Sequence, residues 1–226
     1  MKTKAVLIFA DALQVDLVKR GLPVSLQSLV RLPVLGSECG ADVHLFTSAM
    51  RESSPNVHVH SQHGATFAER LERATDEVAA LGYEQIVIVG RDCPLLENAD
   101  INRAFSGLTT RQLVLGPDHR GGCYLIGLRA SNRSLLRGVC WKRNTDCRQL
   151  IERAGGDVLL LPIKQDVDSW RDLSLLARSS LKLGRLLRLL LERLLSLGRD
   201  RFEVLVDPAR KAIRVRQQIP PPVLAT

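Results

Sequence analysis

Short runs of branched apolar residues recur along the chain and alternate with segments of helical periodicity. The apolar runs cover residues 5–10, 41–47, 85–90, 112–116, 123–129 and 157–162. Between them, residues 66–81 place apolar side chains at helical spacing, and Gly82 ends that segment. Shorter helical patterns cover 99–105 and 145–154. Strands and helices that alternate in this way predict a three-layer α/β/α sandwich around a mostly parallel sheet, with 5–10 as a central strand.

The last part of the sequence differs in kind. Residues 181–197 include ten leucines and carry a polar stripe at helical spacing, so the predicted helix has an apolar face too wide to leave in water. It could pack on the body, form a homodimer, or lie on a membrane surface, the last being least favoured without Trp or Phe anchors. Residues 202–219 read as a hairpin. We therefore expect a body domain, 1–178, and a C-terminal extension, 179–226.

Charge and cysteine content narrow the class of protein. The formal net charge is +8, but residues 181–226 hold ten Lys or Arg and four Asp or Glu, so the body is nearly neutral and nucleic acid is disfavoured as a partner. The five cysteines show no CxxC spacing, which favours reduced thiols in a cytoplasmic protein over a disulfide framework. No apolar run approaches the roughly 20 residues that span a bilayer.

Three histidines, His58, His60 and His63, lie in the polar segment 51–64. Alternation with valine places the first two on one face of a short strand. Imidazoles that converge can bind a metal ion. We favour solvated histidines on an edge strand, because the segment has no accompanying cluster of acids or cysteines.

Two predicted strands deliver polar residues to what should be one edge of the sheet. The run 86–89 ends in a loop that holds Asp92, and the run 113–115 leads to a polar turn that ends in Gly121 and Gly122. Ligands of open α/β sheets bind beyond the carboxyl ends of the strands. A carboxylate there can hold a divalent cation that bridges phosphate oxygens, and glycines let the backbone approach a ligand. The pattern predicts a diphosphate-binding site.

Four stretches in this order resemble the motifs of a bacterial family of nucleotide-diphospho-sugar transferases with the glycosyltransferase-A fold. They are IVIVGRDCPLL at 86–96, LVLGPDHRGGCYLIGL at 113–128, GVCWKRNTDCRQLIERAGGDVLLLP at 138–162 and QDVDSWRDL at 165–173. Members of this family have been catalogued as a domain of unknown function, and some are labelled arsenosugar-biosynthesis glycosyltransferases. The resemblance covers residues 4–178 and implies a Rossmann-like sandwich, a nucleotide-sugar donor, an acceptor of unknown identity and Mg²⁺ or Mn²⁺.

Carried over residue by residue, the resemblance implies roles for six positions, to which we add Arg120 as a catalytic position where the sequence departs from the family. The nucleotide-binding positions are Lys19, Asp92, Gly121 and Gly122; the metal ligands are Asp92 and Asp166; the catalytic positions are Asp92, Arg120 and Asp168. Plain structural roles compete with these. Asp92 could cap the turn at Pro94, and Asp168 could cap a helix that starts near Trp170.

The sequence departs from the family pattern at Arg120, where relatives have an aspartate before the paired glycines. In one interpretation its guanidinium pairs with phosphate oxygens and replaces the metal, which gives a metal-independent glycosyltransferase or one with an altered donor. In the alternative, catalysis is lost and the chain is a binding or oligomerisation module with the 181–197 helix as its interface. We favour a transferase, and rank a nucleic-acid or membrane-surface binder third.

Overall fold

The computed structural model describes residues 3–10, 34, 36–48, 57–167, 172, 203–205 and 214–216. The chain divides into two compact units, Met1–Leu173 and Ser174–Thr226. Lys19, Asp168 and the predicted helix over 181–197 lie outside the described residues. Within the described ranges, no helix has the length and apolar character needed to cross a membrane.

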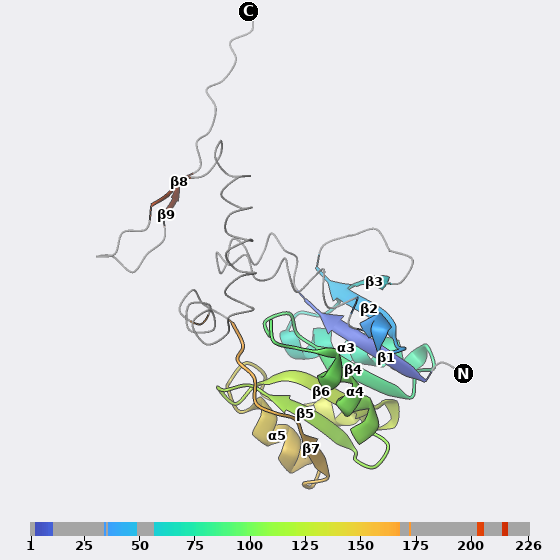
Figure 1. Cartoon of the computed structure of the whole chain (residues 1–226). Helices are drawn as coiled ribbons and strands as arrows, with labels where there is room; N and C mark the ends of the chain where they lie inside the picture. Colours follow the sequence, from blue (N-terminus) through green and yellow to red (C-terminus); the bar gives the residue numbers. More distant parts are fainter. Residues whose placement is uncertain are drawn as a thin grey trace, which may run out of the picture. The chain divides into compact units, whose positions relative to one another are not determined.

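A seven-stranded sheet forms the centre of the first unit, with the strand order β3-β2-β1-β4-β6-β5-β7 (Figure 1). The strands are β1 (Lys4–Phe9), β2 (Asp42–Thr47), β3 (Val57–Ser61), β4 (Gln85–Val89), β5 (Leu113–Pro117), β6 (Cys123–Arg129) and β7 (Val158–Leu160). Every neighbouring pair is parallel except those of β6, which runs antiparallel to both β4 and β5. The predicted α/β fold with a mostly parallel sheet is therefore confirmed.

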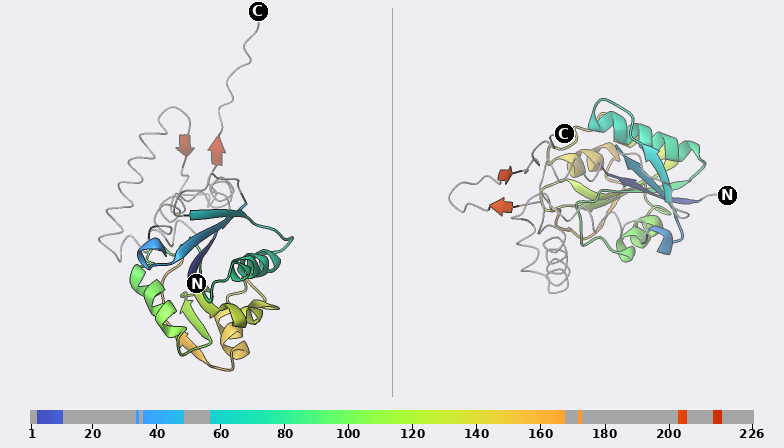
Figure 2. Two further views of the ribbon diagram at one scale, coloured as in Figure 1. Left: turned by 90° about the vertical axis from the view of Figure 1, so that its right-hand side faces the viewer. Right: turned by 90° about the horizontal axis from the view of Figure 1, so that it is seen from above.

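Helices cover both faces of this sheet. They are α3 (Phe67–Ala80), α4 (Asn98–Gly107), the 3-10 helix η1 (Ala130–Leu136) and α5 (Asp146–Arg153). Figure 2 shows α4 on one face, with α3 and α5 on the other. Because side chains of a strand alternate between its two faces, each face has its own buried hydrophobic cluster, as a three-layer sandwich requires.

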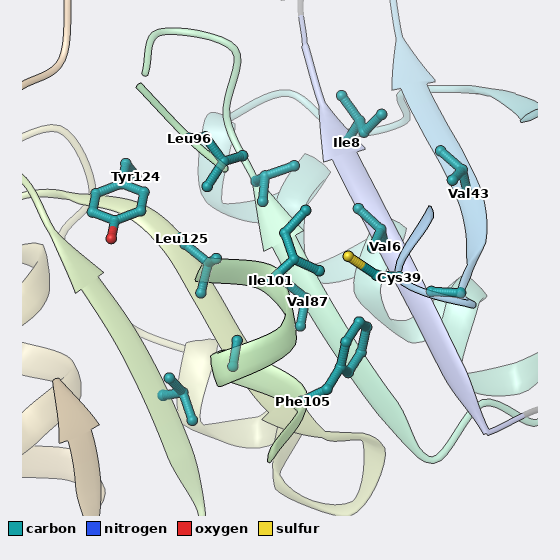
Figure 3. Packing of buried hydrophobic residues seen from close by; sticks show 14 of the residues in the cluster. Val6, Ile8, Cys39, Val43, Val87, Leu96, Ile101, Phe105, Tyr124 and Leu125 are labelled. Carbon is teal, nitrogen blue, oxygen red and sulfur yellow. The ribbon is translucent and has the colours of Figure 1, made fainter. Parts of the chain in front are cut away.

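The packing under α4 shows why the sequence forms these layers. Ile101 and Phe105 lie one helical turn apart and point onto the sheet, where they meet Val6 of β1 and Val87 of β4 (Figure 3). All four side chains are at most 2% exposed. The apolar residues that repeat every 3.6 positions in the helix and every two positions in the strands thus pack together in one core.

A buried ion pair joins the segment after β7 to the start of α4. Lys164 Nζ lies 2.5 Å from Asp100 Oδ2 and donates to the Leu95 carbonyl at 2.7 Å. Asp100 Oδ2 also accepts the Glu97 backbone N–H at 2.8 Å, which caps the helix. This contact holds residues 164–167 at the edge of the sheet where β4 ends.

Some elements differ from expectation in extent or environment. The strand predicted over 157–162 is limited to the three residues of β7. His60 on the edge strand β3 is hydrogen-bonded to His44 (3.0 Å, Nε2 to Nδ1) and to Glu77 (2.8 Å, Nδ1 to Oε1). In the described ranges, no group of three or more His, Cys, Asp or Glu is arranged to hold a metal ion, so the histidines do not form the metal site considered above.

In the second unit, two strands bear out the predicted hairpin. They are β8 (Glu203–Leu205) and β9 (Arg214–Arg216), and they pair antiparallel. The turn expected at Asp207 and Pro208 lies outside the described residues.

Candidate functional site

A cavity of about 370 Å³ lies at the edge of the sheet where β1, β4, β5 and β7 end and β6 begins. Its walls come from the end of β1, the loop after β4, the turn before β6, residues 141–146, the start of α3 and Asp166. Pockets for small molecules and cofactors have volumes of about 300–1,000 Å³ and favour this edge of α/β sheets. The predicted location of the site and the cavity coincide.

Asp92 and Asp166 lie in the wall of this cavity and come from distant parts of the sequence. The backbone N–H of Val167 donates to the carbonyl of Asp92 at 2.8 Å, which joins the loop after β4 to the segment after β7. The ion pair between Lys164 and Asp100 anchors that segment to the start of α4. Backbone and ion-pair contacts therefore hold the two segments that carry Asp92 and Asp166 at one edge of the sheet.

The turn between β5 and β6 is built around the carboxylate of Asp118, which also lines the cavity. Asp118 Oδ1 accepts the backbone N–H groups of Arg120 at 2.6 Å and of Gly122 at 3.0 Å. A Cβ on Gly122 would collide with this carboxylate, and a Cβ on Gly121, whose φ is +100°, would collide with the Asn144 carbonyl. The need for glycine at both positions thus comes from the protein's own packing.

Residues 141–147 form the wall beside this turn. The backbone N–H of Cys147, in the first turn of α5, donates to the Gly121 carbonyl at 3.1 Å. Lys142 and Asn144 have left-handed backbones, with φ of 62° and 57°. Such conformations are costly outside glycine and concentrate at functional sites, which singles out this segment as part of the site.

The guanidinium of Arg120 is directed to a carboxylate. Its Nη2 atom lies 2.6 Å from Asp172 Oδ2, and the side chains are 32% and 9% exposed. Arg120 is absent from the described residues that line the cavity, whereas Arg91 and Lys142 are among them. The basic residues that line the cavity, among those described, are therefore Arg91, which directly precedes Asp92, and Lys142.

Two cysteines line the cavity, and neither is an activated nucleophile. Burial raises the pKa of Cys93 to about 12. Contact with Cys147, together with burial, raises the pKa of Cys123 well above its ordinary value. Because the thiolate is the nucleophile, both side chains are unreactive thiols at neutral pH.

The cavity offers oxygen ligands, which suit a hard cation such as Mg²⁺ or Mn²⁺. Asp92 and Asp166 would hold the ion. The described carboxylates do not form a three-ligand group, so water and ligand oxygens would complete the coordination, as is usual for Mg²⁺ at phosphate sites. A cation bound there would neutralise phosphate charge next to Asp92.

Of the positions named from the sequence, Asp92, Gly122 and Asp166 line the cavity, and Gly121 supports it from the turn. Most of the other lining residues were not among them, including Asp118, Trp141, Lys142 and Asp146. Asp118 stands in the predicted turn and could have been chosen on that ground. The other three depend on how 141–147 docks on Gly121, for which the sequence carries no signal.

Solved structures share this fold. The "putative nucleotide-diphospho-sugar transferase" of Desulfovibrio desulfuricans G20 is 21% identical, with a TM-score of 0.71, over 85% of this chain and 98% of that one. Rv0371c of Mycobacterium tuberculosis H37Rv, in complex with manganese, is 18% identical, with a TM-score of 0.53, over 79% of this chain and 100% of that one. CMP:2-keto-3-deoxy-manno-octonic acid synthetase, in complex with CTP, is 10% identical, with a TM-score of 0.51, over 79% and 100%. The chain shares its fold with these three proteins.

The family follows from the sequence match. Residues 30–143 match the family described as "uncharacterized protein conserved in bacteria (DUF2064)", which is half of the chain, and the chain belongs to this family. This confirms the resemblance carried by the four motifs. No curated protein matches the chain.

Proposed function

We propose that this protein binds a nucleotide-diphospho-sugar in the cavity at the ends of β1 and β4 and transfers the sugar to an acceptor. The observation that carries the proposal is that Asp92 and Asp166 line the same cavity, with their segments joined by the 2.8 Å backbone hydrogen bond from Val167 to Asp92. Two fixed carboxylates can hold a divalent cation against a diphosphate. The fold and family make a transferase the reaction class that fits best.

The chain's own residues would divide the work. Arg91 and Lys142 place positive charge on the cavity wall, where it can stabilise the diphosphate that leaves when the bond to the sugar breaks. A bound Mg²⁺ or Mn²⁺ would add Lewis-acid stabilisation of the same group. Arg120 could take part only by leaving Asp172, so we assign it a positioning role in the turn. Asp168 keeps its predicted catalytic role, and Lys19 its predicted role in nucleotide binding.

A second candidate reaction is nucleotidyl transfer. Likeness to a synthetase that was solved with CTP favours it, because the same edge of the sheet would then bind a nucleoside triphosphate. The two reactions differ in the leaving group. A glycosyltransferase releases a nucleoside diphosphate from a nucleotide sugar, whereas a nucleotidyltransferase releases pyrophosphate.

Product release separates these candidates. The full chain is incubated with UDP- and GDP-sugars, and separately with nucleoside triphosphates and sugar phosphates, with Mn²⁺ or Mg²⁺. We expect slow release of UDP or GDP, because water takes the sugar when no acceptor is present. This release needs the cation and is lost in Asp92→Asn, whereas Asp157→Asn, at a residue that pairs with Arg111 outside the cavity, serves as the control. Pyrophosphate release would move the assignment to the second candidate. Neither product, together with absence of binding, would favour the non-catalytic module.

A further inference from the structure

Asp146 is a buried carboxylate, and one of its oxygens has no hydrogen-bond partner among the residues that the structure describes. The residue is 9% exposed and lines the cavity. Its Oδ2 accepts the backbone N–H of Lys142 at 3.3 Å, whereas Oδ1 has no hydrogen-bond partner among the described residues. A buried carboxylate oxygen without a donor is costly, so the place of Oδ1 in a residue that lines the cavity fits a ligand that supplies the donor.

Trp141, in the same wall, has a hydrogen-bond donor that is unpaired among the described residues, whereas Asp146 has an unpaired acceptor. Its indole Nε1 is buried, and the described residues offer it no acceptor. The indole ring meets Phe67 edge to face, with centroids 5.9 Å apart, and Phe67 also lines the cavity. One wall therefore presents an acceptor, a donor and aromatic surface. This combination matches a ring that carries hydroxyl groups, since a hydroxyl can both donate and accept.

The topology separates Asp146 from the position expected for the nucleotide. From β1 the chain adds β2 and β3 on one side and then β4 on the other side, so β1 and β4 flank a topological switch point. Nucleotides bind at such points in open α/β sheets. Phe9 and Ala10 at the end of β1, and Arg91 and Asp92 after β4, line the cavity there. Asp146 belongs to the opposite half of the sheet, because its helix is attached to the turn between β5 and β6.

Charge also disfavours a diphosphate directly beside Asp146. Asp118 and Asp146 line the cavity together, and burial, with a smaller contribution from the charge of Asp118, raises the pKa of the Asp146 carboxyl. Two carboxylates repel phosphate groups unless a cation lies between them. The uncharged part of a nucleotide sugar is therefore the better match for Asp146.

We propose that Asp146 and Trp141 bind the hydroxyl groups of the transferred sugar, with Asp146 Oδ1 as acceptor and Trp141 Nε1 as donor. This inference rests on the proposed function, and it assigns the sugar subsite to residues that neither the family match nor the similar structures identify. It makes the 141–146 wall the determinant of which sugar the protein accepts.

Calorimetry with Asp146→Asn tests the assignment. Asparagine keeps the size of the side chain and one oxygen for the Lys142 N–H, but it removes the charge. The full-length chain is titrated with UDP-glucose and GDP-mannose, and with UDP and GDP alone, in Mn²⁺. We expect the substitution to weaken binding of the sugar nucleotide about 10- to 100-fold, the usual worth of a hydrogen bond to a charged group, and to leave the free diphosphate unaffected.

Two further variants sharpen the result. Trp141→Phe keeps an aromatic ring and removes the Nε1 donor, so it should weaken the sugar nucleotide alone, by a smaller factor. Asp157→Asn, outside the cavity, should change neither ligand. Equal weakening of diphosphate and sugar nucleotide by Asp146→Asn, or no weakening of either, would overturn the inference. If the unaltered chain binds free UDP or GDP and gains nothing from the sugar, the subsite is refuted while nucleotide binding stands; failure to bind any nucleotide refutes the proposed function itself.

Discussion

Arg120 Nη2 and Asp172 Oδ2 lie 2.6 Å apart, and this contact ties the turn between β5 and β6 to the segment that follows β7. The Asp172 side chain is 9% exposed, so its charge depends on a partner. The residue that replaces the family aspartate therefore acts first within the protein. Its positive charge is already engaged before any phosphate arrives.

Replacement of Arg120 should reduce stability more than binding. Arg120→Ala leaves the Asp172 carboxylate without this partner, and we expect the free energy of unfolding to fall by roughly 1–3 kcal/mol, less than for a fully buried pair because the arginine is partly exposed. Urea denaturation of Arg120→Ala, Asp172→Asn and the double variant measures the coupling. A stable Arg120→Ala variant that no longer binds a nucleotide sugar would instead support direct phosphate binding by Arg120.

The Lys164–Asp100 pair should be the strongest single electrostatic contact at the edge of the site. Its side chains are 14% and 5% exposed, so Lys164→Met leaves a buried carboxylate at the start of α4. We expect a loss of about 3–5 kcal/mol in the free energy of unfolding. Addition of Asp100→Asn should recover part of the loss. Equal stability of Lys164→Met and the parent chain in urea would show that the pair does not anchor the 164–167 segment.

The two glycines of the turn should respond to alanine for different reasons. Gly121→Ala forces a side chain into φ +100° against the Asn144 carbonyl, and a cost of roughly 1–3 kcal/mol is expected from backbone strain alone. Gly122→Ala displaces the Asp118 carboxylate and should weaken ligand binding as well. Gly90→Ala, which has open space around its Cα, is the matched control. Thermal melts that show the same small change in all three would contradict this view of the turn.

Asp146→Asn should stabilise the protein near neutral pH while it weakens sugar binding. Burial raises the pKa of the Asp146 carboxyl above its ordinary 3.8, despite hydrogen bonds from the Lys142 and Arg143 backbones that oppose the shift. A raised folded-state pKa means that the stability from this group is full below 3.8 and is lost as pH rises through the folded value. The variant avoids that loss.

Melting temperatures of the parent chain and of Asp146→Asn, measured from about pH 3.5 to about pH 8, test this directly, because the carboxyl titrates within this range. The difference should grow with pH and disappear at the acid end. A variant that is less stable at neutral pH would show that the charge of Asp146 serves the fold. Such a trade between stability and binding is typical of groups kept for function.

Much of the fold could be predicted because it depends on local pattern. Branched apolar runs gave strands where β1, β4 and β5 stand, and Thr66 begins α3 as a cap, its hydroxyl accepting the Glu69 N–H at 3.1 Å. The direction of β6 could not be deduced from its residues, since a buried strand has the same apolar run in either orientation. β7 ends at Leu160, and beyond it an isolated bridge pairs Lys164 with Asp118.

The site was only partly predictable, because its walls form by long-range docking. Asp92 could be found from its place at a strand end, and Asp166 from the family motif. Asp146 could not be found, since an acid in the first turn of a helix usually interacts with the helix N-terminus. Its burial and its place in the cavity result from the contact between Cys147 and Gly121, which joins residues 26 positions apart.

Binding of a nucleotide sugar is the central claim, and titration calorimetry of the full chain with UDP- and GDP-sugars in Mn²⁺ tests it most directly. We predict saturable binding of at least one donor, weakened about tenfold or more in Asp92→Asn, where a charged contact to the cation is lost. Asp157→Asn should bind as the parent chain does. Absence of binding for every donor, or binding that is unchanged in Asp92→Asn, would contradict the assignment of this cavity.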